Sequence, residues 1–136
     1  MLDRYLDCSA AHMSHDFKKL QVFQMGDQLV IEVYRRTQAF PTNERFGLQA
    51  QLRRASVSVP CNIVEGSARA SNKEYAHFLR IACGSASEAR YLVTVATRLG
   101  YFAAETGSIL EQRFDRVVRG LEVLAQRVAA STGDRD

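Results

Sequence analysis

The chain of 136 residues has the size of one domain, and its 46% apolar and 24% charged residues exclude a disordered or fibrous protein. Its net charge of +3 is small. No apolar stretch approaches the roughly 18 residues that a membrane-spanning helix needs, and residues 1–16 lack the pattern of a signal peptide, so we predict a cytoplasmic domain without a membrane partner.

The first predicted element is a helix from Leu20 to Thr37. Its inward face should consist of apolar residues at the three-and-four spacing of an amphipathic helix, with Val30 and Tyr34 beside them. These inward residues are Val22, Met25, Leu29 and Val33. The helix should end before Phe40-Pro41, because the residue that precedes a proline is pushed away from the α region.

The second predicted helix runs from a cap at Thr42 or Asn43 to about Gly66. Its inward residues are Leu48, Leu52, Ala55, Val59 and Ile63. Pro60 lies inside this helix, removes the hydrogen bond to the carbonyl of Ser56 and crowds that turn. We therefore expect a kink there, or otherwise a break into two shorter helices.

A capping box predicts the start of the third helix at Ser71. The Ser71 hydroxyl and the Glu74 carboxylate can each accept a hydrogen bond from a backbone N–H that has no partner within the helix. The inward residues alternate between spacings of four and three: Tyr75, Leu79, Ala82, Ala86, Ala89, Val93 and Ala96. Alanine dominates this face, so a neighbouring helix can approach closely. Gly100 is expected to end the helix.

The fourth predicted helix opens near Thr106 or Ser108, where Ser108 and Glu111 form a second capping box. It carries a heptad of apolar residues: Leu110, Phe114, Val117, Leu121, Leu124 and Val128. Short connections between amphipathic helices place neighbours antiparallel, which predicts an all-α fold, an up-down-up-down four-helix bundle. We place the bundle at residues 17–130, between a flexible extension (1–16) and a polar, disordered tail (131–136).

Catalytic and metal-ligating groups are sparse. The cysteines are odd in number and form no CxxC pair, so we interpret Cys8, Cys61 and Cys83 as reduced, buried small hydrophobes. His12 and His15 lack a third metal ligand, and the single spacing of Glu74 and His77 has no second Glu-x-x-His to complete a di-iron site. No glycine-rich phosphate loop or hydrolase motif is present. We therefore expect that the protein is not an enzyme and that it binds neither a cofactor nor a metal ion.

The second and third predicted helices, read together, resemble a known family of bacterial four-helix-bundle proteins. The run from Gln51 to Gly66 is its most specific part. Matching segments are Phe17-Lys18-Lys19-Leu20, Phe40-Pro41 with Glu44 and Gly47-Leu48, Gln51-Leu52-Arg53-Arg54-Ala55, Val59-Pro60-Cys61-Asn62-Ile63-Val64-Glu65-Gly66, Tyr75 to Leu79, Ala82, Gly84-Ser85 and Glu88. Val64 departs from the alanine that is usual before the Glu-Gly pair.

This family includes proteins encoded by intervening sequences in large-subunit ribosomal RNA genes, and the accessory variability proteins of diversity-generating retroelements are related to it. The resemblance implies a four-helix protomer and a homopentameric ring without known catalysis. It also implies a role in binding nucleic acid, RNA or DNA, or a nucleic-acid enzyme such as a reverse transcriptase.

The basic residues are fifteen arginines and three lysines. The planar guanidinium group suits bidentate phosphate contacts, which favours nucleic-acid binding, although a solvated arginine-rich surface is an equal alternative. Adjacent residues on a helix point about 100° apart, so at least one of Arg53 and Arg54 must be available to a partner. The candidate phosphate-binding residues are Arg53, Arg54, Arg69, Lys73 and Arg80.

The fourth predicted helix has two unlike flanks. One flank is basic and consists of Arg113, Arg116, Arg119 and Arg127, and the other is acidic and consists of Glu111, Asp115 and Glu122. Unlike patches suit the head-to-tail contacts of a ring, so we expect these residues at a subunit interface. Local pairing, such as Asp115 with Arg119, is the alternative.

Four polar residues lie on or near the predicted seams between helices, where an unpaired charge would be costly. They are Asn62, Glu65, Ser85 and Glu88, and we expect hydrogen bonds among them or to arginine. Two functions remain open: an oligomer that binds nucleic acid, or an oligomeric scaffold that binds another protein. Outside predicted core positions, no aromatic cluster with interleaved basic residues indicates base stacking.

Overall fold

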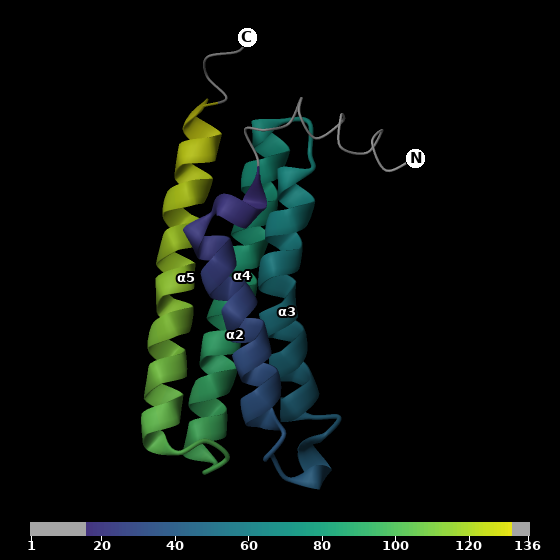
Figure 1. Ribbon diagram of the computed structural model, residues 1–136, viewed down its shortest axis with the longest axis vertical. Coiled ribbons are helices and arrows are strands. Elements are labelled where there is room, and N and C mark those ends of the chain that lie inside the picture. Colours follow the sequence, from purple (N-terminus) through teal and green to yellow (C-terminus); the bar gives the residue numbers. More distant parts are fainter. Residues whose placement is uncertain (1–15, 132–136) are drawn as a thin grey trace.

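The computed structural model describes residues 16–131, and this part of the chain is helical without strands. Its elements are η2 (Phe17–Lys19), α2 (Gln21–Thr37), η3 (Thr42–Glu44), α3 (Leu48–Ser67), α4 (Asn72–Arg98) and α5 (Ala104–Ala130), where η denotes a 3-10 helix. The four α-helices lie side by side, with α2 and α4 each packed against both α3 and α5. Successive connections alternate between the two ends of the molecule (Figure 1).

The core forms on the predicted faces of α3 and α4, where every inward residue named above is buried. In α2, Val22, Leu29 and Val33 are buried, whereas Met25 is half-buried and Tyr34 is exposed. The heptad of α5 is buried as far as Leu121, after which Ala125 takes the core position. A straight helix drifts about 20° per heptad, so the buried face moves away from Leu124 and Val128, which are only half-buried.

Two predicted helix starts are wrong. Thr42 and Asn43 begin the short helix η3, while α3 begins at Leu48 after Gly47 and has no side-chain cap. Helix α5 begins at Ala104, so Ser108 lies inside the helix and its hydroxyl accepts a bond from Gln112. The residues at these two N-cap positions, Gly47 and Ala103, have no polar side chain that could accept from the orphan backbone N–H groups, so both helices begin without a side-chain cap.

The start of α4 is as predicted. Ser71 is the N-cap, and its hydroxyl accepts a hydrogen bond from the backbone N–H of Glu74 at 3.1 Å. Gly100 follows the end of α4 with a φ of 80°, the left-handed conformation that favours glycine. Helix α3 continues through Pro60 as one helix, so the alternative of two shorter helices is wrong.

The cysteines differ from their predicted burial. Cys61 is exposed, and Cys83 is half-buried between α4 and α5, where its thiol donates to the carbonyl of Val118 at 3.6 Å. Burial, and then the charge of Glu122, raises the pKa of the Cys83 thiol. The cause at Cys61 is its place beside Pro60: the proline takes the core position and the next residue points outward.

Cys8, His12, His15 and the predicted extension and tail lie outside the described residues, except for Asp16 and Ser131. Asp16 caps η2 by accepting from the backbone of Lys18, and the Ser131 hydroxyl accepts from the Asn72 side chain. None of the helices within residues 16–131 has both the length and the apolarity that crossing a membrane requires.

Candidate nucleic-acid interface

A groove of about 480 Å³ opens at the end of the molecule where α2 leads into η3 and α3. Its lining combines arginines, aromatic rings and amides: Tyr34, Gln38, Phe40, Thr42, Arg45, Phe46, Gln49, Ala50, Arg53 and Arg54. We call this the α2–α3 groove. Three of its lining residues are arginines and none is a carboxylate.

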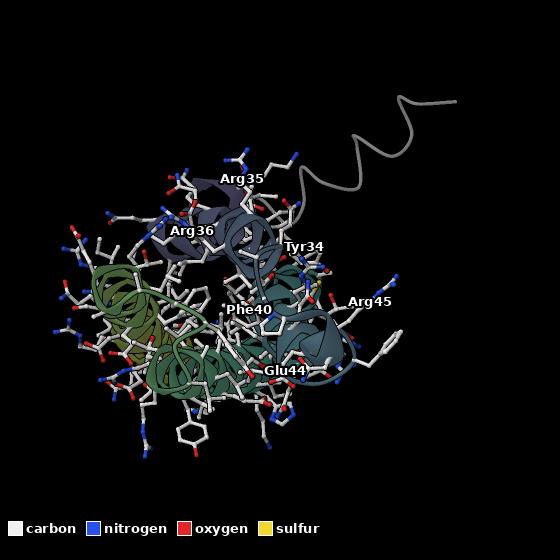
Figure 2. The ribbon with its side chains drawn as sticks, turned by 90° about the horizontal axis from the view of Figure 1, so that it is seen from below. Tyr34, Arg35, Arg36, Phe40, Glu44 and Arg45 are labelled. Carbon is white, nitrogen blue, oxygen red and sulfur yellow. The ribbon has the colours of Figure 1, made fainter. Side chains whose placement is uncertain are left out.

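Aromatic packing holds the linker that forms the groove. Phe40 is buried, and its ring lies 4.9 Å from that of Phe102 and 5.3 Å from that of Tyr101, centroid to centroid. The α2–α3 linker is thereby fixed to the α4–α5 linker. Viewed along the helices from this end, Phe40 lies between the helices while Arg45 points away from them (Figure 2).

Arg53 forms the rigid part of the groove. Its Nε donates to the Thr37 hydroxyl at 2.9 Å, and its Nη2 donates to the carbonyl of Tyr34 at 3.2 Å. Its guanidinium group also lies 4.5 Å from the centroid of the Tyr34 ring. A cation that binds the last carbonyls of a helix is favoured there, so Arg53 ties the end of α2 to α3 with its guanidinium group already oriented.

Arg45 and Arg54 are less constrained. Both are exposed, and neither forms an ion pair with another residue in the described part of the chain. The Arg45 guanidinium group lies 5.4 Å from the centroid of the Phe46 ring. Their positive charge is therefore not cancelled by a bonded carboxylate of the same chain.

The acidic residues near this end contact other partners. Burial, and then the charge and hydrogen bond of Glu44, raises the pKa of Tyr101, so Glu44 interacts with the α4–α5 linker, while its Oε1 also lies close to Gly47, the residue after Phe46. Glu32 forms an ion pair with Arg36 at 2.8 Å. The hydrogen bond from Arg36, and weaker charge interactions that include Arg113, lower the pKa of Glu32 despite its partial burial.

The structure does not bring the five predicted phosphate-binding residues together. Arg53 and Arg54 line the α2–α3 groove, whereas Arg69 and Lys73 lie where α3 leads into α4, about 24 Å further along the helix axis. Arg69 pairs there with Glu65 at 2.8 Å, and Lys73 lines a hollow that contains Glu74.

Arg80 lies at a third place, in a hollow between α4 and α5 that contains Glu122. The spacing along the chain already separates Arg53 and Arg54 from Arg69, whereas the place of Arg80 depended on how α4 packs against α5. Arg45 and Phe46, which line the groove, were not among the predicted residues. The sequence did contain a signal that Phe46 is exposed. This residue belongs to neither stripe of inward apolar residues, although it lies only two residues before Leu48, the first inward residue of α3.

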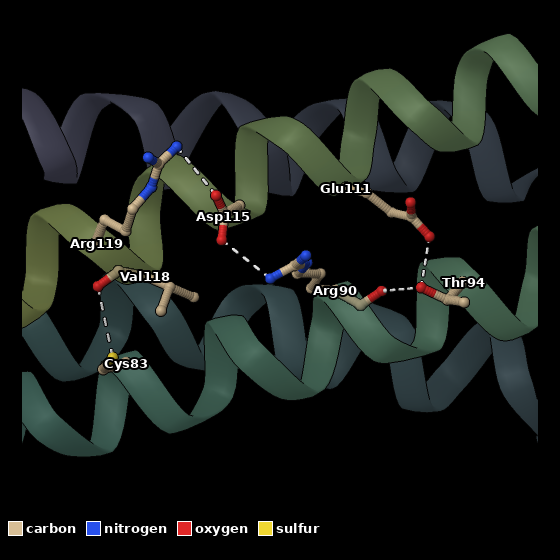
Figure 3. Close-up of polar contacts among 7 residues, drawn as sticks. All are labelled: Cys83, Arg90, Thr94, Glu111, Asp115, Val118 and Arg119. Atoms are coloured by element: carbon tan, nitrogen blue, oxygen red, sulfur yellow. Dashed lines mark hydrogen bonds and ion pairs between the residues drawn. The ribbon is translucent and has the colours of Figure 1, made fainter.

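The acidic flank of α5 contacts the same protomer. Asp115 pairs with Arg119 at 3.0 Å and with Arg90 of α4 at 2.9 Å, and the carboxylate of Glu111 accepts a hydrogen bond from Thr94 (Figure 3). The alternative of local pairing is therefore present at Asp115.

The basic flank is more open. Arg116, Arg119 and Arg127 are exposed, as is Glu122 on the opposite flank. Arg113 is half-buried and interacts with Glu32 of α2. Arg116 and Arg127 form no ion pair with a described residue, so their charges are available to a neighbouring molecule.

The predicted polar contacts between helices form only in part. The hydroxyls of Ser58 and Ser85 are 2.8 Å apart and join α3 to α4, while the Asn62 amide donates to the Ser58 carbonyl at 2.7 Å. Glu65 accepts a hydrogen bond from Arg69 at 2.8 Å, as expected, but Glu65 and Glu88 are both exposed and not buried at a seam. Both carboxylates point to solvent, where they keep their hydration and avoid the free-energy cost of burying a charge.

The match to known proteins covers most of the chain. Residues 18–122 match the family described as 23S rRNA-intervening sequence protein. No curated protein matches the chain. The fold is similar to the crystal structure of a protein of unknown function from the S23 ribosomal protein family of Bacteroides thetaiotaomicron. The TM-score is 0.71 at 18% identity, over 77% of this chain and 95% of that one.

A family match over more than half of a chain identifies its membership, and the shared helical fold agrees with it. The resemblance carried by the run from Gln51 to Gly66 is therefore confirmed, and the chain belongs to the family of 23S rRNA-intervening sequence proteins.

Proposed function

We propose that this protein is a non-enzymatic homo-oligomer that binds RNA through the α2–α3 groove. The observation that carries the proposal is the composition of that groove, which has three arginines and no carboxylate. The hollows around Arg80 and Lys73 each contain a glutamate, which makes the electrostatic potential there less favourable to an anion. Arg54 also lines a second hollow, beside Glu88, so the groove differs from these sites in gathering three arginines.

The geometry of the arginines suits phosphate. Guanidinium groups bind phosphate oxygens through paired N–H donors, and a group whose orientation is already held loses less entropy on binding. Arg53 is held by Thr37 and Tyr34, while Arg45 and Arg54 can adjust to the path of a backbone. One fixed and two adjustable cations favour an irregular, structured RNA over a small anion.

The assembly that we propose is a ring of antiparallel up-and-down bundles, with five members as the family resemblance implies. The exposed and unpaired Arg116 and Arg127 supply one charged patch of α5, and Glu122 supplies a patch of opposite sign. A contact between unlike patches closes into a ring when the rotation between neighbours allows it.

RNA binding is tested by two pairs of substitutions that remove the same charge. The first pair is Arg45→Gln with Arg54→Gln in the groove, and the control pair is Lys73→Gln with Arg80→Gln elsewhere. Fluorescence anisotropy with a labelled hairpin RNA should show affinity that falls steeply with salt. The groove pair should weaken binding about tenfold or more and lower the salt slope by about 2, because each lost phosphate contact removes about one unit.

The control pair should change affinity less than about threefold, since its residues lie outside the groove. Equal losses from the two pairs would assign binding to overall charge and contradict a site in the groove. Absence of any binding at 50 mM salt would reject RNA binding altogether.

A protein-interaction scaffold is the second candidate. Exposed apolar side chains on the outer surfaces of α3 and α4 favour it, namely Val64, Ile81 and Tyr91, which are 38%, 39% and 63% exposed. A reverse transcriptase or another nucleic-acid enzyme is the partner class that this candidate implies. Its signature is capture of that enzyme with little dependence on salt and without RNA.

A further inference from the structure

Phe46 is exposed to an unusual degree for an aromatic side chain. At 86% it is the most exposed large hydrophobic residue in the described part of the chain. It lies between η3 and α3, outside both helical faces, so no core position explains it. A ring held in water at the rim of a basic groove is a surface that a ligand can cover.

The surroundings of Phe46 identify the chemistry of that ligand. Arg45 lies 5.4 Å from its centroid, and Arg53 and Arg54 line the same groove without a carboxylate. An apolar protein segment that covered the ring would strip water from guanidinium groups and offer them no anion, which is costly. A nucleotide offers a flat base to the ring and a phosphate to the arginines, so one ligand satisfies both kinds of group.

The exposed ring also indicates whether the bound base is paired or unpaired. A base inside a duplex is already stacked on both faces and cannot meet a protein ring, whereas bases in loops and single strands can. Tyr34 offers less open surface than Phe46, because it is 42% exposed against 86%. An arginine lies over one face of each ring, so one face of Phe46 remains for a base. We infer that Phe46 is a stacking platform for one unpaired base, so that the α2–α3 groove selects looped or single-stranded RNA over duplex RNA.

This inference rests on the proposed function, and it concerns one exposed ring, not the aromatic cluster with interleaved basic residues that the sequence lacks outside predicted core positions. The groove is open, and its volume of about 480 Å³ lies within the range of small-molecule sites, which is compatible with contact to a single nucleotide. The phosphates on either side of that nucleotide would then lie near Arg45 and Arg54.

The test compares three labelled RNAs, a ten-nucleotide single strand, a hairpin with an open loop and a blunt duplex. Phe46→Ala should weaken binding of the single strand and the hairpin by about fivefold or more, which is the lower end of the stacking contribution of one base. It should change duplex binding less than twofold. Phe46→Tyr should retain wild-type affinity for all three, because its ring still stacks.

The matched control is Tyr91→Ala, which removes an exposed aromatic ring from the outer surface of α4, and it should change none of the three affinities. A second readout uses the absence of tryptophan from the chain. Phe46→Trp places a single indole in the groove, and its fluorescence should be quenched by the single strand and not by the duplex.

The outcomes separate the two proposals. If the wild-type protein binds no RNA at low salt, both are overturned. If it binds and the Arg45→Gln and Arg54→Gln pair weakens it, but Phe46→Ala changes nothing, RNA binding stands and base stacking is overturned. If Phe46→Ala lowers the assembly mass in sedimentation and weakens all three RNAs equally, the ring is a subunit contact and the stacking role is again overturned.

Discussion

At the scale of single residues, a close approach between α4 and α5 depends on Gly107. A methyl group at this position would collide with the Thr97 side chain of α4, reaching its Oγ1 and lying 2.8 Å from its Cγ2. Thr97 is β-branched and its hydroxyl donates to the carbonyl of Val93 at 2.8 Å, so it cannot easily move aside. Gly107→Ala should therefore lower the free energy of unfolding by about 1–3 kcal/mol in urea denaturation.

Gly84 provides the opposite case for comparison. It lies in the middle of α4, and nothing lies within 4 Å of the position of an added Cβ. Gly84→Ala should stabilise the protein by about 1 kcal/mol through helix propensity alone. Combining Thr97→Ala with Gly107→Ala should recover most of the loss at Gly107, and additive effects of these two changes would refute the collision.

At the scale of elements, two serines that look alike in the sequence have different roles. Ser71 and Ser108 each precede a glutamate by three residues, but only the Ser71 hydroxyl accepts from the backbone of that glutamate. Ser71→Ala should cost about 1 kcal/mol of stability because the first turn of α4 loses its cap.

Ser108→Ala should change stability by less than about 0.5 kcal/mol, since Ser108 lies on the exposed side within α5. Thermal or urea unfolding of the two variants under the same conditions measures the contrast. A cost at Ser108 equal to that at Ser71 would mean that α5 begins later in solution than at Ala104.

At the scale of the whole molecule, the proposed ring depends on charges that the protomer leaves unpaired. Arg116→Glu combined with Arg127→Glu reverses two exposed charges of α5 that have no described ion-pair partner. Sedimentation equilibrium should show five protomers of 15.2 kDa for the wild type and a smaller assembly for this variant. Lys73→Glu with Arg80→Glu carries the same change of charge and should leave the mass unaltered.

Persistence of the wild-type mass in the Arg116 and Arg127 variant would support local solvation of these charges instead of a role in assembly. A monomer in the wild-type protein at micromolar concentration would remove the ring from the proposal. Neither result would decide the question of RNA binding, because the RNA measurements test residues of the α2–α3 groove and not Arg116 or Arg127.

The sequence alone determined which faces of α3 and α4 are buried, and most of the buried faces of α2 and α5. Burial follows from a periodicity that is local to each segment, so the stripes from Leu48 to Ile63 and from Tyr75 to Ala96 could be identified without knowledge of their partners. The same is true of the Ser71 cap, whose donor and acceptor are three residues apart.

Only the tertiary structure decided which arginines lie together in the α2–α3 groove and which form ion pairs with carboxylates. Arg53 bonds to Thr37, sixteen positions away, and Phe40, which lines the groove, packs against Phe102 of the α4–α5 linker. Asp115 likewise finds Arg90 on another helix. Such contacts join residues whose separation along the chain carries no information about their distance in space, so charge and aromatic content predict a basic surface but not its location.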